Sequence, residues 1–135
     1  MEDLLPRLIQ LPRFMDYRGS LSFVEEYKHV PFEIRRVFWI YDVPCGENRG
    51  GHAYKGTEEF IIALSGSFDV VLDNGKGDVK NFQMNRSYYG LYVPKMIWRQ
   101  MTNFSTNSVA MVLASSFYDV DDYIHGYVDF KTRVK

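Results

Sequence analysis

One glycine-rich stretch of the chain holds most of the polar side chains that could do chemistry. It covers residues 46–59 and places His52 and Tyr54 two positions apart. Side chains alternate between the two faces of a β-strand, so a strand here would bring the imidazole and the phenol side by side. The unperturbed pKa is about 6.5 for imidazole and about 10 for phenol, which suits His52 to be a general base and Tyr54 to be a hydrogen-bond donor.

Each of these residues also has an ordinary structural explanation. His52 could be a barrel histidine that is hydrogen-bonded to a backbone carbonyl, and Tyr54 could pack with its hydroxyl at the rim. Arginine carries a planar, permanently charged fork of donors. Arg49 or Arg99 could therefore stabilise an enediolate or bind a diphosphate, and either could instead be a structural ion-pair partner.

Four further basic residues receive structural interpretations. His29 and His125 lie outside the polar stretches, and we expect both to be surface or packing residues. Arg35 and Arg36 are neighbours in a predicted strand and cannot share one face, so at least one of them should be solvated or ion-paired at a subunit boundary.

The elements that must position these groups are mostly β-strands. Nine short β-rich runs are separated by turn residues about every ten positions, a spacing typical of a sandwich or barrel. The runs cover residues 8–14, 20–27, 34–41, 58–64, 67–72, 78–83, 89–93, 98–103 and 109–114. Asn74 and Gly75 favour a hairpin turn, because both residue types adopt positive φ angles. Nine strands predict an all-β jelly-roll barrel, since an open sheet would leave exposed edges.

The two ends of the chain read differently from its middle. Asp119 or Asp121 could cap a short C-terminal helix that runs through Tyr123 and Ile124 and packs back on the barrel. The segments before Tyr27 read as edge strands that could pair with a second subunit. We therefore predict a homodimer with exchanged N-terminal strands.

Length and composition exclude several classes of protein. The 135 residues are 46% hydrophobic and 24% charged, so we expect a single domain over residues 1–135. The net charge of −1 provides no basic field for nucleic acid or an acidic membrane. The apolar runs are far shorter than the roughly 20 residues of a membrane helix, and the start of the chain lacks the pattern of a secretory signal. The single Cys45 suits a reducing compartment, so we expect a cytoplasmic location.

The spacing of several residues resembles that of the cupin superfamily. The positions that match its two motifs are Gly46, His52, Glu59, Gly66, Pro94 and Asn103. Tyr54 stands where the first motif has its second histidine, and Arg99 stands where the second motif has its histidine. Because a permanently protonated guanidinium repels a cation, we expect the metal site of the cupins to be absent.

A longer match resembles the bacterial dTDP-sugar 3,4-ketoisomerases, which are WxcM-like cupins. The matching stretches are residues 16–21, 49–55, 90–93, 98, 111–115, 118–119 and 122–124. The resemblance implies a cupin jelly-roll (double-stranded β-helix) that forms a homodimer and needs neither metal nor cofactor. It also implies an isomerase that moves the keto group of dTDP-4-keto-6-deoxy-glucose from C4 to C3 through an enediol. The product would supply amino-sugar and surface polysaccharide biosynthesis.

The resemblance also implies a set of site residues. Catalysis would fall to His52 and Tyr54, where the family pattern is Arg-Gly-x-His-Ala-His-Lys. The residues expected to bind substrate are Arg18, Arg49, Lys55, Arg99 and Tyr92. The position of Arg99 holds His or Arg among such enzymes and is tied to the face of the sugar that is reprotonated, so both the gluco and the galacto product stay open.

Two other functions fit the same residues. A cupin could bind the nucleotide sugar without turning it over. A metal-dependent cupin oxygenase or isomerase could use His52 and Glu59.

Overall fold

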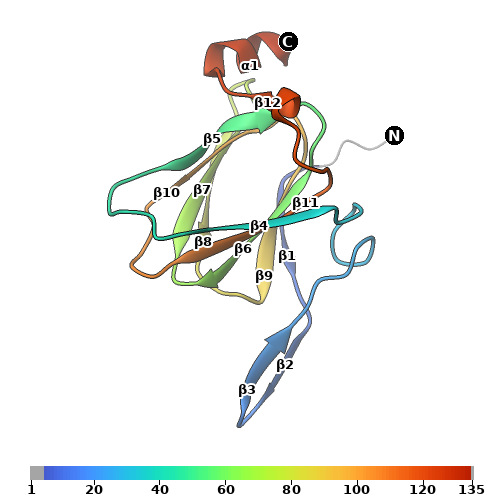
Figure 1. The fold of residues 1–135 in the computed structure, drawn as a ribbon, viewed down its shortest axis with the longest axis vertical. Helices are drawn as coiled ribbons and strands as arrows, with labels where there is room; N and C mark the ends of the chain where they lie inside the picture. Colours follow the sequence, from blue (N-terminus) through green and yellow to red (C-terminus); the bar gives the residue numbers. More distant parts are fainter. Residues whose placement is uncertain (1–4, 135) are drawn as a thin grey trace.

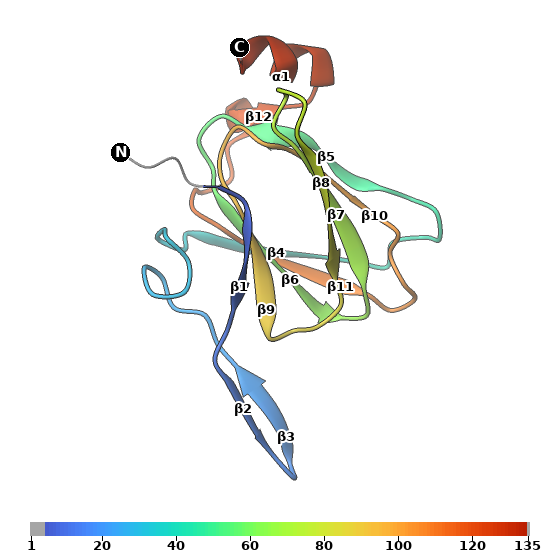
Figure 2. The ribbon, with the colours of Figure 1, turned by 180° about the vertical axis from the view of Figure 1, so that it is seen from behind.

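In the computed structural model, which describes residues 5–134, the barrel consists of two facing five-stranded sheets (Figures 1 and 2). The first sheet, in spatial order, contains β1 (Arg7–Gln10), β9 (Tyr89–Val93), β6 (Glu59–Ser65), β11 (Val109–Ala114) and β4 (Arg36–Tyr41). The second contains β12 (Tyr123–Ile124), β5 (Arg49–Tyr54), β10 (Trp98–Thr102), β7 (Phe68–Asp73) and β8 (Val79–Met84). From β4 onward the chain crosses repeatedly between the sheets, and this confirms the predicted jelly roll.

Alternation of side chains along the strands builds the core between the sheets. On β7, Phe68, Val70 and Leu72 are buried and point inward, where they meet residues such as Leu91 and Val112 of the first sheet. Each fully buried side chain of this kind contributes about 1.5–3 kcal/mol. β6 is buried on both of its faces, because the N-terminal segment packs a second apolar cluster against its outer side.

Several strand boundaries differ from those predicted. The run 8–14 is divided into β1 and β2 (Arg13–Asp16), because Pro12 between them has no N–H to continue a ladder. The run 20–27 shortens to β3 (Gly19–Ser22), which pairs with β2 in a hairpin that projects from the barrel (Figure 1). β5 was absent from the nine predicted strands, because its paired glycines lower its β-propensity and pairing with β10 and β12 orders it.

The C-terminal helix was predicted at the wrong residues. Asp119 does cap a turn, but this is a single 3-10 turn over Val120–Asp122, and the next two residues form β12 at the edge of β5. The helix α1 follows at Tyr127–Arg133 and packs back on the barrel through the buried Phe130, 5.8 Å from the Trp98 ring. Within residues 5–134, neither helical segment is long and apolar enough to cross a membrane.

Candidate active site

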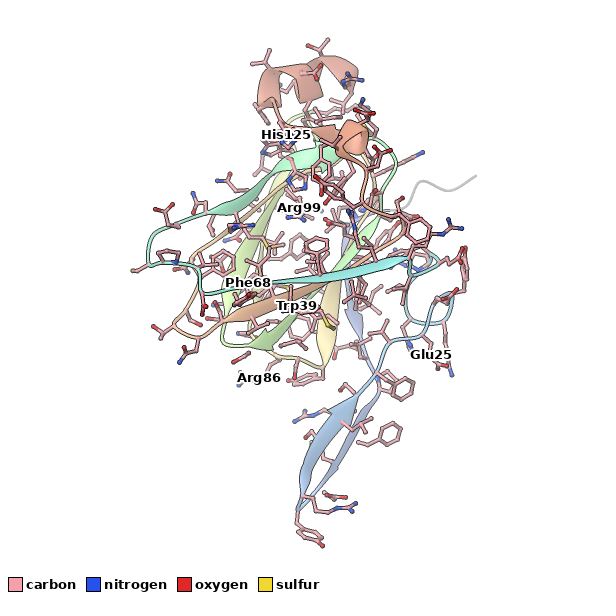
Figure 3. The ribbon with its side chains drawn as sticks, viewed as in Figure 1. Glu25, Trp39, Phe68, Arg86, Arg99 and His125 are labelled. Atoms are coloured by element: carbon pink, nitrogen blue, oxygen red, sulfur yellow. The ribbon has the colours of Figure 1, made fainter. Side chains whose placement is uncertain are left out.

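A cavity of about 380 Å³ opens between the two sheets at one end of the barrel. One wall comes from β4 and the other from β5 and β10, so the cavity exists only because the sheets face each other. The lining residues are Arg36, Phe38, Ile40, Arg49, Gly50, His52, Tyr54, Arg99, Tyr118 and Tyr123. Figure 3 shows Arg99 inside the barrel below β5, with His125 beyond it at the end of β12.

His52 offers a neutral, unengaged nitrogen to this cavity. Its Nε2 is buried and has no hydrogen-bond partner among residues 5–134. Burial and then the positive charges of Arg99, His125 and Arg36, in that order of size, together lower the pKa of His52 to about 3. The imidazole is therefore neutral in the free protein, and its lone pair is available to accept a proton.

Tyr54 stands beside His52 as the strand alternation predicts. The two ring centroids are 4.8 Å apart, with the planes at 81°. Burial raises the pKa of the Tyr54 phenol, and the negative charge of Glu59 raises it further. The hydroxyl, which donates to the Tyr123 hydroxyl at 3.5 Å, therefore stays protonated and acts as a donor rather than a base.

A buried ion pair fixes Arg99 on the floor of the cavity. Its Nε and Nη2 donate to Oε1 and Oε2 of Glu59 at 2.5 and 2.9 Å, and both residues are only 1% exposed. Burial alone would lower the pKa of Arg99, but the charge and hydrogen bonds of Glu59 outweigh it and raise that pKa. Nη1 has no partner among the described residues. A Cβ at Gly50, where φ is +75°, would lie 2.3 Å from this nitrogen, so only glycine fits.

Two further arginines make the cavity cationic. Arg36 lies on β4 with its guanidinium carbon 5.5 Å from the Phe38 ring centroid and 5.7 Å from that of Tyr118, and its Nε is buried without a partner within residues 5–134. Arg49 is exposed at the rim. Such a set suits an anionic ligand. Arg35, as expected for one of the two neighbours, points to solvent and pairs with Glu33.

Sequence reasoning missed Arg36 as a site residue, although a signal was present. Arg36 alternates in phase with Phe38 and Ile40, which face the barrel. A basic residue on the inward-facing phase of a strand indicates a polar interior site.

The structure brings His52, Tyr54, Arg49 and Arg99 to the cavity, as predicted. It places the other three predicted residues elsewhere, as follows.

Arg18 lies at the tip of the β2–β3 hairpin, paired with Asp16 at 2.6 Å, and Lys55 is exposed after the end of β5. Tyr92 belongs to the second apolar cluster, and its hydroxyl donates to Glu58 Oε1 at 2.5 Å. Because Leu91 faces the core between the sheets, its neighbour Tyr92 must point to the other side of β9.

His125 and Tyr123 were also missed, because they belong to the tail that was predicted to be helical. Pairing of β12 with β5 brings both rings to His52, whose centroid lies 4.9 Å from Tyr123 and 6.3 Å from His125. His125 is a surface residue, as expected, but its ring lies beside Tyr123 and His52, which line the cavity.

The acidic residue that a metal cupin would use is already engaged. Both carboxylate oxygens of Glu59 accept hydrogen bonds from Arg99. Within residues 5–134, no group of three or more His, Cys, Asp or Glu side chains is arranged to hold a metal ion.

Known proteins resemble this chain over nearly its full length. A family model described as FdtA, WxcM-like, C-terminal matches residues 5–135. The TDP-4-oxo-6-deoxy-alpha-D-glucose-3,4-oxoisomerase of Aneurinibacillus thermoaerophilus is 42% identical over 128 residues, which are 95% of this chain and 91% of that protein.

Two solved structures have the same fold. The TDP-quinovose 3,4-ketoisomerase WlaRB of Campylobacter jejuni is 42% identical, with a TM-score of 0.89 over 94% of this chain and 97% of that one. A His-to-Asn variant of the 3,4-ketoisomerase QdtA from Thermoanaerobacterium thermosaccharolyticum, in complex with TDP-4-keto-6-deoxyglucose, is 32% identical. Its TM-score is 0.93 over 96% of this chain and 93% of that one.

Proposed function

This chain belongs to the FdtA family of WxcM-like proteins, and from this premise we propose how it acts as a TDP-sugar 3,4-ketoisomerase. The substrate is TDP-4-keto-6-deoxyglucose, whose keto group moves from C4 to C3. The observation that carries the mechanism is the buried, unengaged Nε2 of His52 in a cavity lined by arginines. A neutral imidazole in that place can act as a general base and remove a proton from a carbon atom of the bound substrate.

The proton transfers balance without an external oxidant or reductant. His52 takes the proton from C3, and the electrons of that C–H bond form a C3=C4 double bond and leave negative charge on O4. Arg99 Nη1 and the Tyr54 hydroxyl, both of residues that line the cavity, would donate hydrogen bonds to this enediolate oxygen. A proton is then delivered to C4, and the hydroxyl on C3 gives its proton to O4 as C3=O forms, so that O4 becomes a hydroxyl. A positioned acid–base group of this kind contributes about 10²–10⁴-fold to the rate.

Substrate binding should also strengthen the base. We assign the diphosphate to Arg36 and Arg49, whose guanidinium groups provide paired donors for phosphate oxygens. Its negative charges would offset the positive charge of Arg36 and Arg99, which lowers the pKa of His52 in the free protein. The base would therefore be more competent with substrate bound than without it.

We propose that the reaction needs no metal. The guanidinium of Arg99 forms hydrogen bonds with both carboxylate oxygens of Glu59, so that this carboxylate is not free to bind a metal. The guanidinium also supplies a fixed positive charge where a metal cupin would place its cation. A divalent cation beside it would be repelled.

We also propose that two copies of the chain exchange their N-terminal hairpins. The β2–β3 hairpin projects away from its own barrel (Figure 2). It carries Phe14 and Leu21, whose side chains are 63% and 58% exposed. β4 is an edge strand whose Trp39 is 59% exposed, beside a surface hollow of about 520 Å³ that includes Leu64. Apolar patches of this kind mark interfaces. In such a dimer the hairpin could carry Arg18 to the partner. The cytoplasmic location stays a prediction.

The function is tested by isomerisation in deuterated water. The protein is incubated with TDP-4-keto-6-deoxyglucose, and proton NMR follows the loss of the C3–H signal and the uptake of deuterium at C4. We expect turnover by the unaltered chain and by His29→Asn, and a loss of about 10²–10⁴-fold in His52→Asn. The H4–H5 coupling of product made in ordinary water assigns the gluco or galacto product.

Binding without exchange of carbon-bound hydrogen would contradict the proposed function and leave a non-catalytic cupin. Full activity of His52→Asn would contradict the role of the base. Unchanged turnover after chelation and dialysis supports metal independence, and loss of turnover that an added divalent metal restores contradicts it.

The dimer is tested by light scattering on the eluting protein. We expect twice the 15.8 kDa chain mass for the unaltered protein and the chain mass for a Phe14→Glu/Leu21→Glu variant. A monomeric unaltered protein would overturn the exchange.

A further inference from the structure

Four aromatic rings form one cluster beside the cavity: two from β5, one from β12 and one from the residue that follows β12. β12 pairs with β5 in a register that sets Tyr123 opposite Tyr54, and two positions further, just past the end of β12, the His125 ring centroid lies 6.3 Å from that of His52. The Tyr54 and Tyr123 centroids are 4.8 Å apart. Tyr123 and His125 stack face to face at 5.3 Å, with 6° between their planes. The stack holds the His125 ring in place beside the cavity.

This cluster places a half-buried imidazole next to an exposed one. His52 is half-buried and aims Nε2 at the cavity, whereas His125 faces solvent. The two rings are close enough for a positive charge on one to be felt by the other, and a charge on His125 lowers the pKa of His52, after burial and Arg99. Their centroid separation of 6.3 Å is one that a single bridging water can span.

The reaction creates a charge that this second imidazole can remove. When His52 takes the C3 proton, an imidazolium forms close to Arg99 of β10 and Arg36 of β4, and like charges at short range destabilise it. Tyr54 keeps its own proton, because burial raises the pKa of its phenol. Among the described residues whose rings contact His52, His125 is the group that can accept a proton in exchange.

We propose that His125 relays the proton of His52 to and from solvent during isomerisation, an inference that rests on the proposed function. The imidazolium of His52 gives up one N–H proton, through a bridging water, to a ring nitrogen of His125. His52 becomes neutral, His125 carries the positive charge, and His125 exchanges its proton with bulk water. A proton returns by the same route and is delivered from His52 to C4, so atoms and charge balance. His125 contacts no reacting carbon and acts through His52.

The relay is tested by the origin of the hydrogen on C4 of the product. Unlabelled substrate is converted in deuterated water by the unaltered protein, by His125→Asn and by His125→Phe, with His29→Asn as a matched control on the loop before β4. Proton NMR gives the fraction of product that keeps substrate hydrogen at C4, and steady-state kinetics give kcat. The affinity for TDP alone, measured by calorimetry, shows that each variant retains a folded cavity.

We expect the unaltered protein and His29→Asn to place deuterium on nearly all product. Without the relay, the proton stays on His52 and returns to the same sugar, so both His125 variants should keep several times more substrate hydrogen and lose roughly tenfold in kcat. An unchanged retained fraction in both variants overturns the relay, whatever happens to kcat. The relay is also overturned if all product made by the unaltered protein keeps substrate hydrogen at C4. Absence of turnover by the unaltered protein would instead refute the proposed function.

Discussion

Replacement of the Arg99–Glu59 pair, one partner at a time and then together, gives the sharpest energetic test of the site. Both side chains are 1% exposed and are joined by two hydrogen bonds at 2.5 and 2.9 Å. Removing one partner leaves the other as an uncompensated buried charge, which costs about 3–5 kcal/mol. Glu59→Leu and Arg99→Met should each lower the free energy of unfolding by that amount.

The double variant should behave in the opposite way. Glu59→Leu/Arg99→Met removes both charges together with the unsatisfied Nη1, and it fills the same space with apolar groups. Such replacements are neutral or stabilising by about 1–4 kcal/mol. The double variant should therefore be at least as stable as the unaltered protein, although it should bind TDP weakly and turn over no substrate.

Urea unfolding of the four proteins measures this coupling. The exposed Arg35–Glu33 pair serves as the control, and its cycle should give a much smaller coupling energy, since water screens both charges. Where a single variant fails to fold, the double variant still tests the reasoning, because it is expected to fold. A double variant destabilised by the sum of the two single losses, about 6–10 kcal/mol, would refute it.

Three other perturbations have defined outcomes. Gly50→Ala should lower the free energy of unfolding in urea by about 1–3 kcal/mol and weaken TDP binding, because residue 50 has a positive φ angle and the added Cβ would collide with the Arg99 guanidinium. Gly51→Ala is the control and should change little, because its Cβ would lie 3.8 Å from the nearest Trp98 atom. Tyr54→Phe should keep TDP affinity while kcat falls roughly 10²–10³-fold, and an unchanged kcat would remove the phenol from the mechanism. The pKa of His52 is lowered to about 3 in the folded protein, whereas the same side chain in the unfolded chain has its ordinary pKa of about 6.5. Between these two pH values the unfolded chain therefore binds one more proton than the folded protein. Stability should therefore fall as pH drops from 6 to 4, by at most about 1.4 kcal/mol per pH unit, and His52→Asn should lack this component of the slope.

Local patterns in the chain were enough to find most strands and the central pair of rings. The apolar runs at 89–93 and 109–114 coincide with β9 and β11, because strands buried on both faces carry continuous β-formers that need no further context. The spacing of His52 and Tyr54 places both on one face wherever that segment is extended. The pairing of a histidine base with a phenol donor was therefore available from the sequence alone, once a strand was assumed.

The composition of the cavity depended on contacts between residues far apart in the chain. Glu59 and Arg99 are 40 positions apart, and no period within either segment indicates that their side chains meet. β5 exists because β10 pairs with it, and β12 replaces the predicted helix because the edge of β5 was open to a partner strand. That pairing brings His125 to His52, and side chains on separate strands become neighbours only when the register between those strands is set. Strand periodicity is a local property, whereas register and facing between strands arise from packing of the whole barrel.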